Sequence, residues 1–342
     1  MALEFGIDTF GDVTWDDEGR DLSQAQVIRN VVAEGILADE VGLDVFGLGE
    51  HHRDDFAISA PEPVLAAIAA QTSRIRLTSA VTVLSSDDPI RVYQRFSTLQ
   101  AISGGRAEIT LGRGSFTESF PLFGHDLSDY EMLFEEKLEI IAALVQQGKV
   151  SFEGRHRRAL KNQTVYPLPE TPIPVWIGVG GSPDSVVRAA SHNMPMALAI
   201  IGGNPARFKP YADLYREVRE KMEAPALPLG CHSPGHVART DREARDRFFE
   251  GYAIMHQRIG RSRGWPPLSR KAFDHEIDHG ALYVGSPDTV AEKIAATVRV
   301  LGLDRFDLKY SAGPVSHDAM MDTIRLYGED VVPRVRNILA RG

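Results

Sequence analysis

The chain has 342 residues, of which 43% are hydrophobic and 25% are charged, and its formal net charge is −9 at pH 7. Such a chain can bury a large core, either as one barrel with insertions or as two smaller domains. The acidic balance argues against nucleic acid as a partner, and the longest apolar stretches are shorter than the roughly 20 residues that cross a membrane. We therefore expect neither a nucleic-acid surface nor a membrane partner.

Cysteine usage and the start of the chain bear on the compartment. Cys231 is the single cysteine, so an intrachain disulfide cannot form, and this suits a reducing environment. The first predicted strand begins almost at Met1, without the basic and then apolar leader of a secretory signal. Together these features predict a cytoplasmic protein.

Short apolar runs alternate with longer amphipathic segments along the whole chain. The predicted strands are residues 3–10, 44–48, 75–84, 107–111, 175–179, 196–200, 227–237 and 305–310. The predicted helices are residues 23–40, 61–72, 89–102, 130–146, 184–192, 205–222, 241–259 and 287–301. Residues 154–174 and 262–281, rich in proline or basic side chains, are predicted to be insertions. Eight alternating strands favour the α/β class, and within it a single (β/α)₈ TIM barrel over residues 1–342, rather than a doubly wound sheet.

Active sites of such barrels lie at the carboxyl ends of the strands. Glu50, His51 and His52 directly follow the second predicted strand, so a carboxylate and two imidazoles are expected at the mouth of the barrel. Glu50 and His51 are the candidate catalytic residues. Two alternatives stay open: Glu50 either orients His51 or binds backbone, and His52 is either a second functional histidine or a structural neighbour.

Two glycine-rich turns after strands are candidates for an anion site. Arg113 stands between two glycines after the fourth strand, where its guanidinium can reach a ligand anion. Gly180, Gly181 and Ser182 end the fifth strand and open a helix whose first turn contains Ser185, so free backbone N–H groups can hold a phosphate. The alternative is a tight turn with Arg113 paired to a carboxylate. A dinucleotide site is not expected, because no acidic residue ends the following strand.

Residues 275–279 match the HExxH pattern of zinc proteases. We do not expect a metal site there. Asp278 and Gly280 suit neither a buried helix nor its continuation, and the sequence places no third ligand for zinc. The segment is instead expected at the rim of the pocket.

Four separated motifs, in this order and spacing, resemble the bacterial luciferase-like family of flavin-dependent monooxygenases. The match runs from the first strand to the last helices. The motifs are Glu50-His51-His52, the strand 78–84 followed by Asp88-Pro89, the segment Ser103-Gly104-Gly105-Arg106 leading to Gly112-Arg113-Gly114, and Pro174-Val175-Trp176-Ile177 leading to Gly180-Gly181-Ser182.

The resemblance implies a barrel that binds FMN, or F420 in some branches, with the cofactor phosphate at Arg113 and at the turn of Gly180, Gly181, Ser182 and Ser185. It also implies a non-prolyl cis peptide at Ala80-Val81 against the flavin ring. His51 matches the family's catalytic histidine, which would hydrogen-bond or deprotonate near the reduced flavin, a role that needs a base poised near neutrality.

The function so implied is a two-component FMN monooxygenase that acts with O₂ on an unknown small organic substrate. A separate flavin reductase is the expected partner, because the chain offers no second nucleotide-binding domain. The resemblance also suggests a homodimer. Two alternatives stay open, an F420-dependent dehydrogenase on the same barrel and a non-catalytic flavin-binding protein.

Overall fold

The computed structural model describes residues 2–16 and 18–341 and shows a nearly closed barrel of parallel strands. The strands follow the order β3-β2-β1-β12-β10-β9-β8-β5-β4, and β3 and β4 are the two parts of one predicted strand. A parallel bridge between Leu77 of β3 and Ala107, which lies just before β5, brings β3 beside β5 and so closes the circle of strands. The predicted TIM barrel is therefore confirmed. The barrel strands are β1 (Glu4–Thr9), β2 (Val45–Leu48), β3 (Arg76–Ser79), β4 (Thr82–Val83), β5 (Ile109–Gly112), β8 (Val175–Val179), β9 (Met196–Ala199), β10 (Leu229–Val237) and β12 (Arg305–Lys309).

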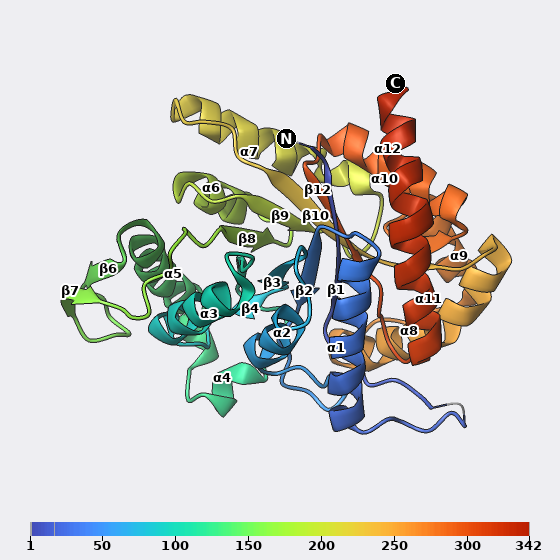
Figure 1. Cartoon of the computed structure of the whole chain (residues 1–342), viewed down its shortest axis with the longest axis horizontal. Helices are drawn as coiled ribbons and strands as arrows, with labels where there is room; N and C mark the ends of the chain where they lie inside the picture. Colours follow the sequence, from blue (N-terminus) through green and yellow to red (C-terminus); the bar gives the residue numbers. More distant parts are fainter. Residues whose placement is uncertain (1, 17, 342) are drawn as a thin grey trace.

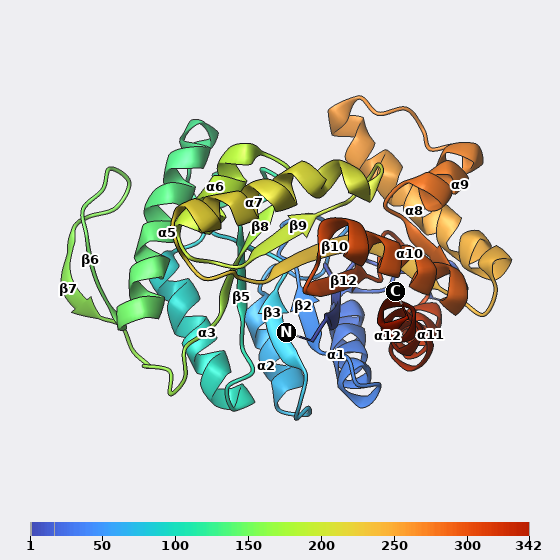
Figure 2. The ribbon, with the colours of Figure 1, turned by 90° about the horizontal axis from the view of Figure 1, so that it is seen from above.

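Helices surround the strands, as the two views in Figures 1 and 2 show. Several begin at capping side chains that the sequence places there: the Ser23 hydroxyl accepts from the Gln26 amide, and the Asp88 carboxylate accepts from Ile90 and Arg91. The helices are α1 (Gln24–Glu40), α2 (Pro61–Ala69), α3 (Pro89–Ser103), α4 (Ser119–Leu122), η1 (Leu127–Asp129), α5 (Tyr130–Gln147), α6 (Pro183–Ser191), η2 (Pro205–Phe208), α7 (Lys209–Lys221), α8 (Asp241–Arg263), α9 (Arg270–His279), α10 (Pro287–Leu301), α11 (His317–Leu326), η3 (Tyr327–Val331) and α12 (Val332–Ala340).

The two predicted insertions are more regular than the sequence indicates. Within 154–174, β7 (Leu160–Thr164) pairs with β6 (Lys149–Phe152) in an antiparallel hairpin that lies beside α5 at the periphery (Figure 1). Within 262–281, α8 continues to Arg263 and α9 follows. The structure also adds β11 (Tyr283–Gly285), a three-residue strand parallel to the end of β10, which the sequence analysis missed.

The sequence assigns residues 275–279 to an insertion, but in the structure they form a helix, which ends before Gly280 as expected. α9 covers them, because the Ser269 hydroxyl caps its start and the helix buries Phe273 and Ile277 on one face. Asp278 is compatible with this helix, since it points outward and pairs with Arg245 at 2.6 Å.

The barrel interior is charged at the amino ends of the strands. Alternate residues of β12 face the two sides of the sheet, so Phe306 and Leu308 pack in the apolar core while Arg305 reaches the interior. Arg305 is buried and pairs with Glu108 at 2.8 Å and with Asp307 at 2.9 Å. These ion pairs fill that end of the barrel, and the opposite end is left open. No helix in the described part of the chain is long and apolar enough to cross a membrane.

Candidate active site

A cavity of about 480 Å³ occupies the open end of the barrel. Small side chains create it: glycine or alanine stands at six inward positions on five strands, namely Gly47, Gly112, Gly178, Ala197, Ala199 and Gly230. Its volume lies within the range of small-molecule sites. Six of the predicted site residues line it, Glu50, His51, Ala80, Val81, Arg113 and Gly180.

The peptide bond between Ala80 and Val81 is cis, as the family resemblance implies. Both residues line the cavity. A Cβ atom on Gly112 would lie 2.4 Å from the side chain of Val81, so the neighbouring strand needs a glycine at this position. Ala80 and Val81 therefore form part of the cavity wall between the end of β3 and the start of β4.

Glu50 is held by two contacts, and neither involves His51. Its Oε1 lies 2.8 Å from Nε2 of His52, and its Oε2 accepts from the backbone N–H of Val83 at 3.1 Å. The sequence left open whether Glu50 orients His51 or binds backbone. The structure shows that it binds His52 and the backbone. Its carboxylate connects the end of β2 to β4, next to the cis peptide. His52 also contacts Phe123, away from the His51 ring.

His51 lies in a cage of aromatic rings. The ring centroids of Phe10, Phe56 and Phe116 lie 4.5, 4.5 and 4.9 Å from that of His51. Burial lowers the pKa of His51 to about 3, and the positive charge of Lys309 adds to this shift. The imidazole is thus neutral at physiological pH, rather than a base poised near neutrality. Its Nε2 is buried and has no hydrogen-bond partner among the described residues.

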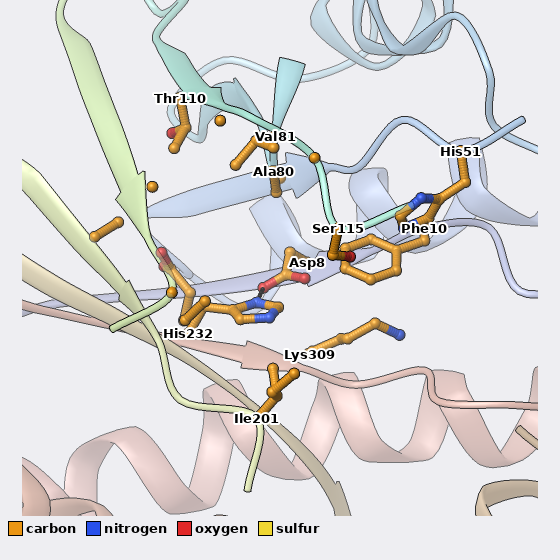
Figure 3. Close-up of a pocket in the computed structure, with 18 of the residues that line it drawn as sticks. Asp8, Phe10, His51, Ala80, Val81, Thr110, Ser115, Ile201, His232 and Lys309 are labelled. Atoms are coloured by element: carbon orange, nitrogen blue, oxygen red, sulfur yellow. Dashed lines mark hydrogen bonds and ion pairs between the residues drawn. The ribbon is translucent and has the colours of Figure 1, made fainter. Parts of the chain in front are cut away.

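A second polar group lines the cavity floor, and the sequence analysis missed it. Nδ1 of His232 on β10 lies 2.7 Å from Oδ2 of Asp8 on β1, and Lys309 of β12 lies beside them (Figure 3). Lys309 donates to Asp12 at 3.2 Å. The sequence did contain a pattern that could have identified these residues. They are charged or polar residues at alternate positions of otherwise apolar strands, and such residues must face the barrel interior.

Two arginines converge on Ser185 next to one end of the cavity, which Arg113 lines and Arg188 does not. Arg113 donates to the Ser185 hydroxyl at 3.2 Å, and Arg188 donates to the same oxygen at 3.3 Å. Both arginines also pair with Glu131, a residue whose side chain is 58% exposed. Arg188 was not predicted, although it follows Ser185 at a spacing of three on the same helix. The predicted alternative, a carboxylate partner for Arg113, is therefore present as well.

The turn before α6 completes this end. Gly181 adopts φ +107°, a conformation that favours glycine, and Ser182 caps the helix by accepting from the Ser185 amide. The Ser182 hydroxyl also lies 2.8 Å from that of Ser185. Gly181, Ser182 and Ser185 are not part of the cavity wall itself, but they stand directly behind Arg113. The helix N-terminus and two guanidinium groups make this end suited to an anion.

Residues of α8 and the loop after it form the outer wall of the cavity. Tyr252, Met255 and His256 of α8 line it. Arg263 at the end of the helix lies over the rings of Phe116 and Trp265 at 5.6 and 5.4 Å, and donates to the Ser115 carbonyl at 3.2 Å. The start of the predicted insertion 262–281 therefore reaches the cavity rim.

The HExxH match has a structural explanation. The Glu276 carboxylate accepts from the backbone amides of Gly203 and Ala281 at 2.7 and 2.8 Å and so fixes the end of α9. Within residues 2–16 and 18–341 no group of three or more histidine, cysteine, aspartate or glutamate side chains is placed to hold a metal ion.

Comparisons with known proteins agree with the fold and the motifs. A family described as luciferase-like monooxygenase matches residues 9–305. The chain is 28% identical to the alkanal monooxygenase alpha chain of the Kryptophanaron alfredi symbiont, over 92% of this chain and 95% of that protein. It is also 28% identical to an F420-dependent glucose-6-phosphate dehydrogenase of Microbacterium testaceum, over 90% and 93% of the two chains.

A solved structure extends the comparison to the fold. The oxygenating constituent of 3,6-diketocamphane monooxygenase from Pseudomonas putida, in complex with FMN, has a TM-score of 0.78 at 20% identity. The similarity covers 98% of this chain and 99% of that chain.

Proposed function

Because this chain belongs to the luciferase-like monooxygenase family, we propose that it is a flavin-dependent oxidoreductase that uses reduced FMN and O₂ on a small organic substrate. The observation that carries the proposal is the convergence of Arg113 and Arg188 on Ser185, next to the end of the barrel cavity that Arg113 lines. A flavin phosphate would occupy that end, and the ring would lie in the cavity against Ala80 and Val81. When bound, reduced flavin supplies the two electrons that activate O₂.

The residues of the site fit an FMN molecule. The Glu131 carboxylate pairs with both arginines, and guanidinium groups that bind a carboxylate in this way can bind a phosphate through the same charge-assisted contacts. Glu50 fixes the backbone beside the cavity wall, and His51 presents a neutral imidazole near the mouth. The outer wall of α8 residues is suited to the apolar part of a substrate.

The first test is an FMN titration of the wild type and of Arg113→Ala, followed by flavin fluorescence. We expect FMN to bind, and the variant to lose about one to two decades of affinity, because a charge-assisted hydrogen bond contributes roughly 1.5–3 kcal/mol. Riboflavin, which lacks the phosphate, should bind both proteins equally. Failure of the wild type to bind FMN in either redox state would contradict the proposal.

A substitution of Glu131 should have the opposite effect. In Glu131→Gln the carboxylate that both arginines share is removed, so it no longer competes with the phosphate, and FMN affinity should rise by a factor of about 2 to 10, the range of a modest exposed ion pair. Isothermal titration calorimetry measures the change. Glu217→Gln is the matched control, since Glu217 is exposed to a similar degree and pairs with Lys221 on α7. A fall in affinity would show that Glu131 helps to hold the phosphate site together.

An F420-dependent dehydrogenase is the second candidate. The F420-dependent relative from Microbacterium testaceum favours it, because its similarity covers nearly the full length of both chains. Parallel titrations with FMN and F420 discriminate between the two. Tighter binding of F420, with hydride transfer to a substrate and no consumption of O₂, would replace the monooxygenase proposal.

Three further parts of the proposal rest on the sequence and on the family resemblance. A separate reductase supplies the reduced flavin, and rapid NADH oxidation by the purified protein alone would refute this. The protein forms a homodimer, which sedimentation at micromolar concentration tests. It acts in the cytoplasm.

A further inference from the structure

Asp8 and His232 form a hydrogen-bonded pair at the cavity to which the proposed function gives no role. Nδ1 of His232 lies 2.7 Å from Oδ2 of Asp8. The Asp8 side chain is 3% exposed and that of His232 is 17% exposed, and both line the cavity. His232 is thus the member of the pair that a ligand can reach, and Asp8 supports it. Figure 3 shows the two side chains next to each other, with His51 and Phe10 on the other side of the view.

The hydrogen bond dictates which nitrogen of His232 carries the proton. An ionised carboxylate can only accept hydrogen bonds, so Nδ1 donates to Asp8. Nε2 is then the nitrogen that can give a proton to a ligand, or take one from it. A carboxylate behind an imidazole is a common way to orient a catalytic histidine.

Other charged groups near this pair have partners of their own. On β12, Asp307 stands opposite His232 in the strand register and pairs with Arg305, while Lys309 donates to Asp12. The strand on the other side of β10, β9 (Met196–Ala199), has no titratable residue. Asp8 is therefore the carboxylate that contacts His232.

His51 and His232 lie in different environments. The Phe10 ring stands between them, with centroid distances of 4.5 Å to His51 and 6.1 Å to His232. The aromatic cage keeps His51 neutral and its Nε2 covered. His232 instead has a carboxylate partner and an exposed edge. The geometry therefore favours His232 over His51 for moving protons.

We propose that His232, positioned by Asp8, is the catalytic acid–base residue of this cavity. When bound, anionic reduced FMN would supply two electrons and one proton to O₂, and one further proton would be needed, whether the products are H₂O₂ or, with a substrate, the oxygenated substrate and water. The His232 imidazolium supplies that proton from Nε2 and recovers one from solvent, while the Nδ1 proton stays on the hydrogen bond to Asp8. This inference rests on the proposed function, because it needs a bound flavin.

The positioning role is tested on the protein without cofactor. Nitrogen-15 NMR of histidine-labelled protein reports which ring nitrogen is protonated, and His232→Gln identifies the signal. We expect neutral His232 to carry its proton on Nδ1 in the wild type and on Nε2 in Asp8→Ala. Asp8→Asn should retain the Nδ1 form, because its amide oxygen still accepts. A wild-type signal protonated on Nε2, or no change in Asp8→Ala, would overturn the positioning role.

The catalytic role is tested with FMN bound. Stopped-flow mixing of the reduced complex with O₂, between about pH 5 and 8, should show His232→Gln to be slower by about 10²-fold and to lose the pH dependence of the wild type. Asp8→Ala should share the defect and Asp8→Asn should recover most of the rate. His51→Gln, the matched control, should keep the pH dependence. A rate for FMN-bound His232→Gln within about twofold of wild type at every pH would overturn the inference.

Failure of the proposed function can be distinguished from failure of the proposed role of His232. FMN affinity is measured first for each protein. If the wild type binds no FMN, the proposed function and the proton-transfer role both fall, and the NMR result still decides whether Asp8 positions His232. If all proteins bind FMN and only the kinetic result is negative, the proposed function stands and the role of His232 falls.

Discussion

Arg305→Met is expected to lower the free energy of unfolding by about 3–5 kcal/mol at neutral pH. Arg305 is fully buried inside the barrel, where it pairs with Glu108 and Asp307. Although burial by itself lowers the pKa of the guanidinium, the two carboxylates raise the pKa above its ordinary value. Methionine keeps much of the volume and removes the charge, so two buried carboxylates lose their shared partner. Urea denaturation followed by circular dichroism measures the loss.

Two further measurements show whether the lost charge of Arg305 causes the loss of stability. Arg20→Met removes an exposed arginine that pairs with Asp16 and Glu18, and it should change stability by less than about 1 kcal/mol. The difference between wild type and Arg305→Met should also shrink as the pH falls, since burial already raises the pKa of Asp307 and protonation neutralises this carboxylate, whereas Glu108 still pairs with Arg76. A loss that is unchanged by pH would indicate a packing defect instead.

The double variant Arg113→Ala/Arg188→Ala is expected to lose about two to four decades of FMN affinity. Each guanidinium would give the phosphate a charge-assisted contact worth roughly 1.5–3 kcal/mol. Both arginines share Ser185 and Glu131, so the two losses should not add fully. Fluorescence titration of the two single variants and the double variant completes the cycle and measures the coupling.

Riboflavin again separates loss of the phosphate contact from loss of the cavity, because it shares the ring of FMN and lacks the phosphate. Its affinity should be the same in all four proteins. Arg20→Ala is the control outside the site, as Arg20 is exposed and pairs with Asp16 and Glu18. Equal losses for FMN and riboflavin would mean that the arginines support the shape of the cavity and do not hold the phosphate.

Much of the architecture could be predicted from the sequence, because periodicity and caps are local properties. Apolar runs at strand spacing and helix starts at Ser23 and Asp88 predicted the order of strands and helices. The position of the cis peptide between Ala80 and Val81 came from the motifs of the family. Arg113 and the turn before α6 were found because each directly follows a strand, and parallel strands bring their carboxyl ends to one edge.

The helix α9 was missed for a local reason as well. Its charged residues were assigned to an insertion, but an exposed helix needs only one buried face, which Phe273 and Ile277 supply. β11 is three residues long and forms only because β10 offers it an edge, so its own sequence carries no strand period.

The sequence by itself determined the barrel, its family and the strand ends at which chemistry is expected. Only the tertiary structure decided which side chains meet there. The strands β1 and β10 are more than 200 residues apart in the chain, and no local pattern predicts that Asp8 contacts His232. Nor could the sequence decide between the two roles of Glu50, or show that three phenylalanine rings enclose His51. Burial and contacts across the barrel set the charge state of each group, and both depend on the closed arrangement of all the strands.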